Sequence, residues 1–400
     1  MTNLPQGWEV KKLGEIGEIV TGSTPSKSNL DFYGKDYPFF KPSDFEQGYF
    51  LENAGDNLSK LGFDKARQLP PKTILVVCIG SLGKVALTRV IGSCNQQINA
   101  IIPHKNIIAE YIYYYCISSK FQSILFSKAP QTTLAILNKT EFSKLEIIYP
   151  KDIKEQERIV GILDESFAKI DESIKILEQD LLNLDELMQS ALQKAFNPLK
   201  DNAKENYKLP QGWEWKSLGE IANTSSGGTP SRNKKEYWEN GNIKWLKSGE
   251  LNDGYIDFIE ENITEEAIKN SSAKIFQKGT LLIAMYGATA GKLGILNLDS
   301  TTNQAICAFL HKDKNIKFLE KFLFYFLFFL RDKIIKDSFG GAQPNINQTY
   351  IKNLQIPLPP IKEQEQIASH LDELSSHVKN LKQNYQAQIK DLQELKNSLL

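Results

Sequence analysis

The sequence is poor in the residues that build metal centres and redox sites. Its 400 residues include four cysteines and four histidines. The cysteines form no CxxC pair and no cluster with histidine, which excludes the common zinc motifs. They are Cys78, Cys94, Cys116 and Cys307. We therefore expect no metal site in this chain, and reduced cysteines in the core of a cytoplasmic protein.

The sequence also lacks a long hydrophobic run. The most apolar stretch, residues 322–330, has nine residues, about half of the roughly 20 that cross a bilayer as a helix. The N-terminus shows no basic segment followed by an apolar one, so no signal peptide is expected. With 41% hydrophobic and 24% charged residues, the composition indicates a globular chain of two or three domains.

There is no excess charge of either sign, because 48 basic residues balance 48 acidic ones. Zero net charge alone argues against binding to nucleic acid. The distribution is uneven, however: residues 1–150 hold 16 Lys and Arg against 13 Asp and Glu, and residues 207–358 hold 19 against 16. Residues 151–206 hold 8 against 13, and residues 359–400 hold 5 against 6. Two mildly basic segments therefore alternate with two acidic ones, and the basic segments are the candidates for DNA contact.

The chain contains an internal repeat. Residues 4–16 (LPQGWEVKKLGEI) return as residues 209–221 (LPQGWEWKSLGEI), with 11 of 13 positions identical. Further matches follow in the same order: GSTPS at Gly22 with GGTPS at Gly227, and KEQERIVGILDE at Lys154 with KEQEQIASHLDE at Lys362. The sequence therefore predicts two copies of one unit of about 205 residues, each a globular part followed by a long helix.

Each predicted long helix has an apolar stripe with alternating spacings of four and three, as in a two-stranded coiled coil. A single helix cannot bury such a stripe, so we expect the two helices of this chain to pack on each other in antiparallel orientation. In the first helix the seam comprises Leu163, Phe167, Ile170, Ile174, Leu177, Leu181 and Leu184. In the second it comprises Leu371, Leu374, Val378, Leu381, Tyr385, Leu392 and Leu395.

The globular parts combine strand and helix signals. Short aliphatic runs at residues 74–80 and 281–287 end in glycine and predict buried strands. Aromatic helices are expected at residues 109–126 and 318–335. The predicted fold class is α+β, with two mixed α/β domains and a long two-helix coiled coil. The expected segments are domain 1 (residues 1–150), helix 1 (151–199), a linker (200–208), domain 2 (209–358) and helix 2 (359–400).

No motif for catalysis is present. Residues 287–292 (GATAGK) resemble a phosphate-binding loop but are one residue short, and Leu293 stands where a hydroxyl would bind magnesium. The aromatic-capped Asn/Asp-Pro-Pro motif of amino-methyltransferases is also absent, because Asn197-Pro198 is followed by Leu199. We expect no catalytic residue in this chain.

The remaining signals concern binding. Glycine turns that carry a lysine and Ser/Thr-Pro loops beside a positive charge suit DNA phosphates. Side-chain amides can bond the edge of adenine. The alternative for each residue is a surface turn or a structural hydrogen bond. In the first copy the candidates are Thr24, Ser26, Lys27, Lys41, Lys84, Asn95 and Gln96. In the second they are Thr229, Ser231, Arg232, Lys247, Lys292, Asn303 and Gln304.

With these motifs the chain resembles the specificity subunits of type I restriction–modification enzymes. The features are LPxGWExxxLGEI at the start of each globular part, the TPS loop, the GxxGK turn, and the closing pattern of Ile, Pro, Glu-Gln and Ile. The resemblance implies two target-recognition domains with spacer helices and no catalysis by this subunit. It also implies two methyltransferase subunits that carry S-adenosylmethionine, and restriction subunits that use ATP and magnesium.

The helix length agrees with this resemblance. Residues 163–196 would span roughly 50 Å at 1.5 Å per residue, compared with about 34 Å for one DNA turn. Antiparallel helices would relate the two domains by a pseudo-twofold axis and predict a bipartite target with an unread gap. Two alternatives remain: a scaffold that uses the coiled coil only to assemble proteins, and a self-sufficient methyltransferase or nuclease.

Overall fold

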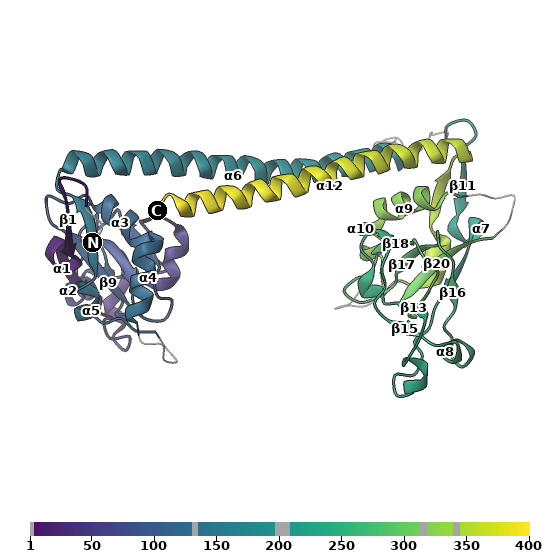
Figure 1. The fold of residues 1–400 in the computed structure, drawn as a ribbon, viewed down its shortest axis with the longest axis horizontal. Helices are drawn as coiled ribbons and strands as arrows, with labels where there is room; N and C mark the ends of the chain where they lie inside the picture. The colour runs from purple at the N-terminus through teal and green to yellow at the C-terminus, as the bar shows by residue number, and fades with distance from the viewer. Residues whose placement is uncertain (1–3, 130–134, 197–208, 313–317, 339–344) are drawn as a thin grey trace. The chain divides into compact units, whose positions relative to one another are not determined.

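A computed structural model describes residues 4–129, 135–196, 209–312, 318–338 and 345–400. The chain divides into two compact units, one formed by residues 1–178 with 386–400 and the other by residues 179–385. Each unit therefore contains one globular part and a portion of both long helices (Figure 1). The expected linker at residues 200–208 and the end of the first helix at Asn197 lie outside the described residues.

The first unit is built on a five-stranded sheet in the order β2-β9-β6-β7-β4. Its strands pair antiparallel except for β4, which runs parallel to β7. They are β2 (Gly17–Thr21), β9 (Ile98–Pro103), β6 (Ile74–Val77), β7 (Val85–Thr88) and β4 (Phe50–Leu51). A smaller sheet has the order β5-β3-β8, with β5 (Asp56–Leu58), β3 (Tyr33–Phe40) and β8 (Ser93–Cys94). The short helices are α1 (Leu13–Ile16), α2 (Lys60–Lys65) and α5 (Lys139–Ser143).

The second unit repeats this plan with the order β12-β20-β17-β18-β14. These strands are β12 (Ala222–Ser226), β20 (Ile306–His311), β17 (Leu281–Ala284), β18 (Leu293–Leu296) and β14 (Gly254–Ile256). Its smaller sheet gains a strand, with β15 (Asn262–Ile263), β13 (Ile243–Leu246), β19 (Ser300–Thr302) and β16 (Ile275–Phe276) in that order. The short helices are α7 (Leu218–Ile221), α8 (Glu265–Lys269) and α11 (Gln348–Asn353).

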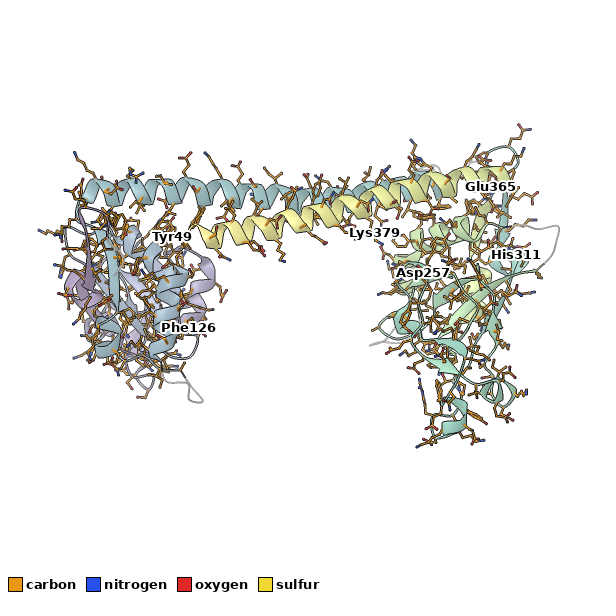
Figure 2. All side chains as sticks on the ribbon, viewed as in Figure 1. Tyr49, Phe126, Asp257, His311, Glu365 and Lys379 are labelled. Carbon is orange, nitrogen blue, oxygen red and sulfur yellow. The ribbon has the colours of Figure 1, made fainter. Side chains whose placement is uncertain are left out.

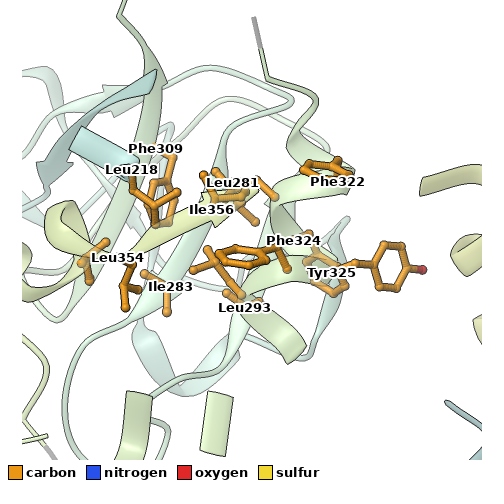
Figure 3. Close-up of a cluster of buried hydrophobic side chains, with 14 of the residues drawn as sticks. Leu218, Leu281, Ile283, Leu293, Phe309, Phe322, Phe324, Tyr325, Leu354 and Ile356 are labelled. Atoms are coloured by element: carbon orange, nitrogen blue, oxygen red, sulfur yellow. The ribbon is translucent and has the colours of Figure 1, made fainter. Parts of the chain in front are cut away.

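Both faces of each main sheet are buried. In β6, Ile74 and Val76 join one hydrophobic cluster and Leu75 joins another, because successive side chains point to opposite faces of a strand. β17 has the same division between its two faces. Figure 3 shows side chains of β17, β18 and β20 gathered with those of an aromatic helix. Burial on both faces explains why these strands are continuous aliphatic runs in the sequence.

The aromatic helices differ from the sequence prediction, because each is two helices. Residues 109–126 form α3 (Ala109–Ile117) and α4 (Ser119–Lys128), and residues 318–335 form α9 (Glu320–Phe329) and α10 (Arg331–Lys336). Ser118 is extended at φ −62° and ψ 145°, and its side chain accepts a hydrogen bond from the Phe121 amide. A serine that caps a new helix in this way ends the preceding one.

The two long helices are α6 (Ile153–Phe196), with 44 residues, and α12 (Ile361–Ser398), with 38 residues. Each follows a two-stranded ribbon that joins the two ends of its globular part: β1 (Trp8–Lys12) with β10 (Glu146–Pro150), and β11 (Glu214–Ser217) with β21 (Gln355–Leu358). No helix in the described ranges combines the length and hydropathy that a membrane span requires.

The long helices meet in antiparallel orientation within each unit. In the second unit, Asp185 of α6 bonds to Lys382 of α12, and Phe196 of α6 shares a cluster with Leu371 of α12. In the first unit, Lys396 of α12 donates to Asp171 of α6 at 2.6 and 2.8 Å. The two helices therefore contact each other in each unit, and the globular cores cover part of their apolar stripes, at Phe167 in the first unit and at Phe196 and Leu371 in the second.

The predicted seam of α6 is buried or half-buried at all seven positions, Leu163, Phe167, Ile170, Ile174, Leu177, Leu181 and Leu184. In α12 the same holds for Leu371, Leu374, Val378, Tyr385 and Leu392. Leu381 and Leu395, however, are 40% and 48% exposed. The side chains of Lys382 and Lys396, one residue further along, are 29% and 34% exposed. A lysine stem can cover apolar surface while its amine reaches a carboxylate, and this moves the seam by one residue at these turns.

A buried glutamine ties each long helix to its globular part. Gln156 is 0% exposed and Gln364 is 1% exposed. The Gln156 Oε1 accepts from the Ile108 amide at 2.9 Å, and its Nε2 donates to the Pro150 carbonyl at 2.9 Å. Gln364 makes the equivalent bonds with the Leu319 amide at 2.8 Å and the Pro359 carbonyl at 2.9 Å. Each glutamine thus joins the start of an aromatic helix, the end of a strand and a long helix.

We predict that Gln364→Met lowers the free energy of unfolding by about 1–3 kcal/mol, because the buried Leu319 N–H and Pro359 carbonyl both lose a partner. Gln366 is exposed on the same helix, so Gln366→Met should change stability by less than about 0.5 kcal/mol. Urea unfolding of the three proteins measures this difference. Equal midpoints for the two variants would show that the buried bonds do not hold the helix.

Candidate nucleic-acid interface

The candidate binding loops of the first unit lie at one end of its main sheet. The loop with Thr24 follows β2, whose last residue Thr21 pairs with Asn99 at the start of β9. The turn with Lys84 follows β6, whose last residue Val77 pairs with Ile98. Since Asn95 and Gln96 directly precede β9, all three loops are neighbours in space.

The second unit has the same arrangement. β12 ends at Ser226, which pairs with Cys307, and β17 ends at Ala284, which pairs with Ile306. The loops with Thr229, Lys292 and Gln304 therefore gather at the corresponding end of its sheet. Residues more than 70 positions apart in the sequence thus form one surface in each unit.

A threonine–glutamine hydrogen bond connects two of these loops in both units. Thr24 Oγ1 donates to Gln96 Oε1 at 2.5 Å, and Thr229 Oγ1 donates to Gln304 Oε1 at 2.5 Å. The backbones also approach closely, because a Cβ placed on Gly22 or Gly227 would lie 2.1 or 2.0 Å from a carbonyl oxygen of the other loop. Only glycine fits at these two positions.

An aromatic side chain donates a hydrogen bond to the backbone of each Thr-Pro-Ser loop. Tyr33 donates its hydroxyl to the Pro25 carbonyl at 2.8 Å. Trp238 donates its indole N–H to the Ser231 carbonyl at 3.1 Å. Both prolines of the loops are buried, whereas Ser26 and Ser231 are exposed. Each loop is therefore fixed in place before any ligand arrives.

Most of the basic candidates have an acidic partner. Lys41 pairs with Asp56 and Lys84 pairs with Glu46. Lys247 pairs with Glu261 at 2.8 Å. Half-exposed ion pairs of this kind contribute about 0–1 kcal/mol. A phosphate could therefore replace the carboxylate at little cost.

Arg232 is the most constrained of these cations. Its guanidinium lies 3.7 Å from the centre of the Trp238 ring and 2.7 Å from Glu261. Burial opposes ionisation of Glu261, but hydrogen bonds from Arg232 and Lys247 hold the pKa of its carboxyl below the usual value. Lys27 and Lys292 form no ion pair among the described residues and are exposed.

The two asparagines serve the turns themselves. Asn95 is 8% exposed. Its Oδ1 accepts from the Gln97 amide at 3.1 Å, and its Nδ2 donates to Gln97 Oε1 at 2.8 Å. Asn303 Oδ1 accepts from the Ala305 amide at 3.2 Å. Gln96 and Gln304, by contrast, are exposed.

The glycine turns are supported by residues that the sequence did not single out. Gly83 has φ +90° and Gly291 has φ +80°, conformations that favour glycine. Gln122 Nε2 donates to the Gly83 carbonyl at 2.9 Å, and Arg331 Nε donates to the Gly291 carbonyl at 3.0 Å. These supports lie on the aromatic helices, about 40 residues along the chain, and no local pattern in the sequence predicts them.

The described residues hold no group of three His, Cys, Asp or Glu side chains suited to a metal ion. Burial raises the pKa of the Cys78, Cys94 and Cys307 thiols to about 12. These thiols stay protonated at neutral pH and cannot act as nucleophiles.

A known protein family matches most of the chain. The family model described as type I restriction modification DNA specificity domain matches residues 5–181 and 210–391, most of the chain. The chain belongs to this family.

Curated relatives are type I specificity subunits. The HindI specificity subunit of Haemophilus influenzae is 38% identical over 186 residues, which cover 45% of this chain and 40% of that protein. The MjaIX specificity subunit of Methanocaldococcus jannaschii is 26% identical, over 99% of this chain and 92% of that protein.

Two solved structures share the fold of the whole chain. One comes from a study of complex assembly and conformational transition of the type I R-M system, with a TM-score of 0.78 and 20% identity over 100% of this chain and 98% of that one. The other is the HsdS subunit from Thermoanaerobacter tengcongensis, with a TM-score of 0.65 and 20% identity over 99% of this chain and 96% of that one. The pair of α+β specificity domains with long helices is thus a known architecture.

Each specificity domain also anchors its long helix through a tyrosine. Tyr114 donates to Asp164 of α6, and Tyr325 donates to Asp372 of α12 at 2.7 Å. Burial, assisted by the bonded carboxylate, raises the pKa of both phenols. The two tyrosines therefore remain hydrogen-bond donors over the whole physiological pH range.

A groove lies beside this anchor in each specificity domain. In the first unit it measures about 630 Å³ and is lined by Tyr49 and Lys396, among others. In the second it measures about 600 Å³, with Asp257 and Lys379 in its walls. Tyr49, Asp257 and Lys379 are labelled in Figure 2. These grooves are separate from the loop cluster, because no lining residue belongs to the Thr-Pro-Ser loops or the glycine turns.

We predict that Asn95→Ala lowers the free energy of unfolding by about 1–3 kcal/mol, because a buried turn loses two hydrogen bonds. Gln96→Ala should change it by less than about 0.5 kcal/mol, since this neighbour is exposed. Thermal unfolding of the two variants separates the structural amide from the exposed one. A larger loss for Gln96→Ala would reverse these assignments.

Proposed function

We propose that this chain is the DNA sequence-specificity subunit of a type I restriction–modification complex. The observation that carries the proposal is the loop cluster of each specificity domain, which presents exposed amide, hydroxyl and cationic groups at one end of a rigid sheet. Such groups are the usual contacts to DNA phosphates and base edges. The family and the type I specificity subunits among the relatives support it.

In this proposal the chain performs no catalysis. Two methyltransferase subunits, which carry S-adenosylmethionine, dock on the long helices, and restriction subunits that use ATP and magnesium join the full complex in the cytoplasm. Exposed apolar side chains on α6, among them Ile162 at 50% and Ile176 at 55%, support a protein partner there.

The long helices set the spacing of the target in this proposal. A continuous helix of 44 residues measures about 66 Å at 1.5 Å per residue, which is nearly two DNA turns. An antiparallel coiled coil of α6 and α12 would hold the two specificity domains as a fixed pair. The target is then bipartite, with an unread gap of several base pairs.

The two half-sites should differ in sequence. The glycine turns read SLGK in one copy and ATAGK in the other, and the smaller sheets have three and four strands. Because base readout depends on a few side chains at fixed positions, such differences change the sequence that is recognised.

A domain exchange tests the proposal. We predict that replacing residues 17–145 with those of another specificity subunit changes the half-site read by the first domain and leaves the other half-site unchanged. Sequencing of the methylated DNA from cells that carry the hybrid and its partner subunits gives the result. Methylation that keeps both original half-sites would contradict the assignment.

A protein-only scaffold is the second candidate, and the balanced charge of the chain favours it. The two functions differ in the salt dependence of DNA binding by the reconstituted methyltransferase complex. We predict that affinity falls by about 10³-fold or more between 50 and 200 mM salt, because several phosphate contacts release counterions. A scaffold would show no such binding at either concentration.

A further inference from the structure

The Thr24–Gln96 and Thr229–Gln304 pairs indicate which part of the DNA these loops contact. We infer that the two glutamines bind the phosphate backbone of each half-site through their Nε2 groups and do not read bases. This inference rests on the proposed function, because it names the part of the DNA that these residues contact.

The orientation of the amides is the first reason. In each pair the threonine hydroxyl donates a hydrogen bond to Oε1 of the glutamine. The Nε2 of Gln96 and of Gln304 has no hydrogen bond to any described residue, and both side chains are exposed. Each glutamine therefore offers two unused N–H donors, while one of the two lone pairs of its Oε1 is already bonded to the threonine. A bidentate contact to adenine needs both a donor and the Oε1 acceptor, and would have to share that oxygen with the threonine. A phosphate oxygen needs only the unused N–H donors, which favours the backbone contact over the adenine contact expected from the sequence.

The repeat is the second reason. The pair occurs at equivalent positions of both copies with the same distance of 2.5 Å, whereas the neighbouring glycine turns differ in sequence and length. A contact shared by two domains that read different half-sites is best placed on a feature that every DNA sequence has in common. That common feature is the phosphate backbone.

The surroundings of each pair are the third reason. Exposed cations stand on the same loops, Lys27 three residues after Thr24 and Arg232 three residues after Thr229. Phosphates are bound by amide and hydroxyl donors beside such cations. The loops are also fixed beforehand by Tyr33 and Trp238, which limits the entropy lost on binding.

The test uses the complex of this chain with its methyltransferase subunits. Its DNA affinity is measured on a duplex with the full target and on one in which the half-site of the second domain is replaced. We expect Gln304→Ala to lower affinity by roughly the same factor, about tenfold, on both duplexes. Gln277 is exposed at the opposite end of β17, and Gln277→Ala serves as the matched control with unchanged affinity.

Gln304→Glu separates ligand binding from a structural bond. Its carboxylate can still accept from the Thr229 hydroxyl, so stability should be kept, but it places a negative charge toward the DNA. We expect a loss larger than that of Gln304→Ala, again equal on both duplexes.

Two results would overturn the inference. Wild-type affinity for both Gln304 variants would show that the pair only joins two loops. A loss confined to the full target would show base readout. A wild-type complex that does not distinguish the two duplexes would instead refute the proposed function, so the two failures can be told apart.

Discussion

The structure depends on the burial of apolar surface along two helices that are too long to be covered by one partner. A helix with a continuous apolar stripe is stable in water only when another surface removes that stripe from solvent. Here the cover comes from two sources. Phe167 of α6 joins the core of the first unit, and Phe196 and Leu371 join the core of the second. Elsewhere the two helices meet each other, through contacts such as Lys396 with Asp171.

This constraint explains why several different contacts join each globular part to its long helix. A buried glutamine, a tyrosine–aspartate bond and a shared hydrophobic core act at the same junction in both units. The glutamine of each long helix accepts a hydrogen bond at the start of an aromatic helix. The tyrosine lies in the middle of that aromatic helix and donates to an aspartate of the long helix. Since the aromatic helices also support the glycine turns through Gln122 and Arg331, they connect the candidate binding loops to the long helix in each unit.

Much of this fold could be predicted from the sequence because its signals are local or repeated. The repeat, the aliphatic strands, the two long helices and the family resemblance all follow from short patterns. The seam of α12 was predicted only in part, because Leu381 and Leu395 match the apolar spacing but the helix turns Lys382 and Lys396 inward. The break of the aromatic helix at Ser118 was missed, since a single cap residue outweighs the apolar pattern on both sides of it.

The candidate binding loops show a similar limit to sequence-based prediction. Sequence reasoning selected the loops that meet at the sheet ends, because glycine, proline and threonine mark turns. It could not distinguish Asn95, which holds its turn, from Gln96, which is exposed, because these neighbours differ only in the contacts that the fold provides. Nor could it assign Glu261 as the shared partner of Arg232 and Lys247. Pairings of this kind depend on distances between segments that are remote in the sequence.

The central proposal is that the two domains of one chain read two different half-sites of one DNA target. The most direct measurement is sequencing of all methylated bases in the genome of a host that carries the intact system. We expect one bipartite target whose two halves differ in sequence and are separated by a gap of constant length. A continuous target, two identical halves, or a gap that varies from site to site would contradict it.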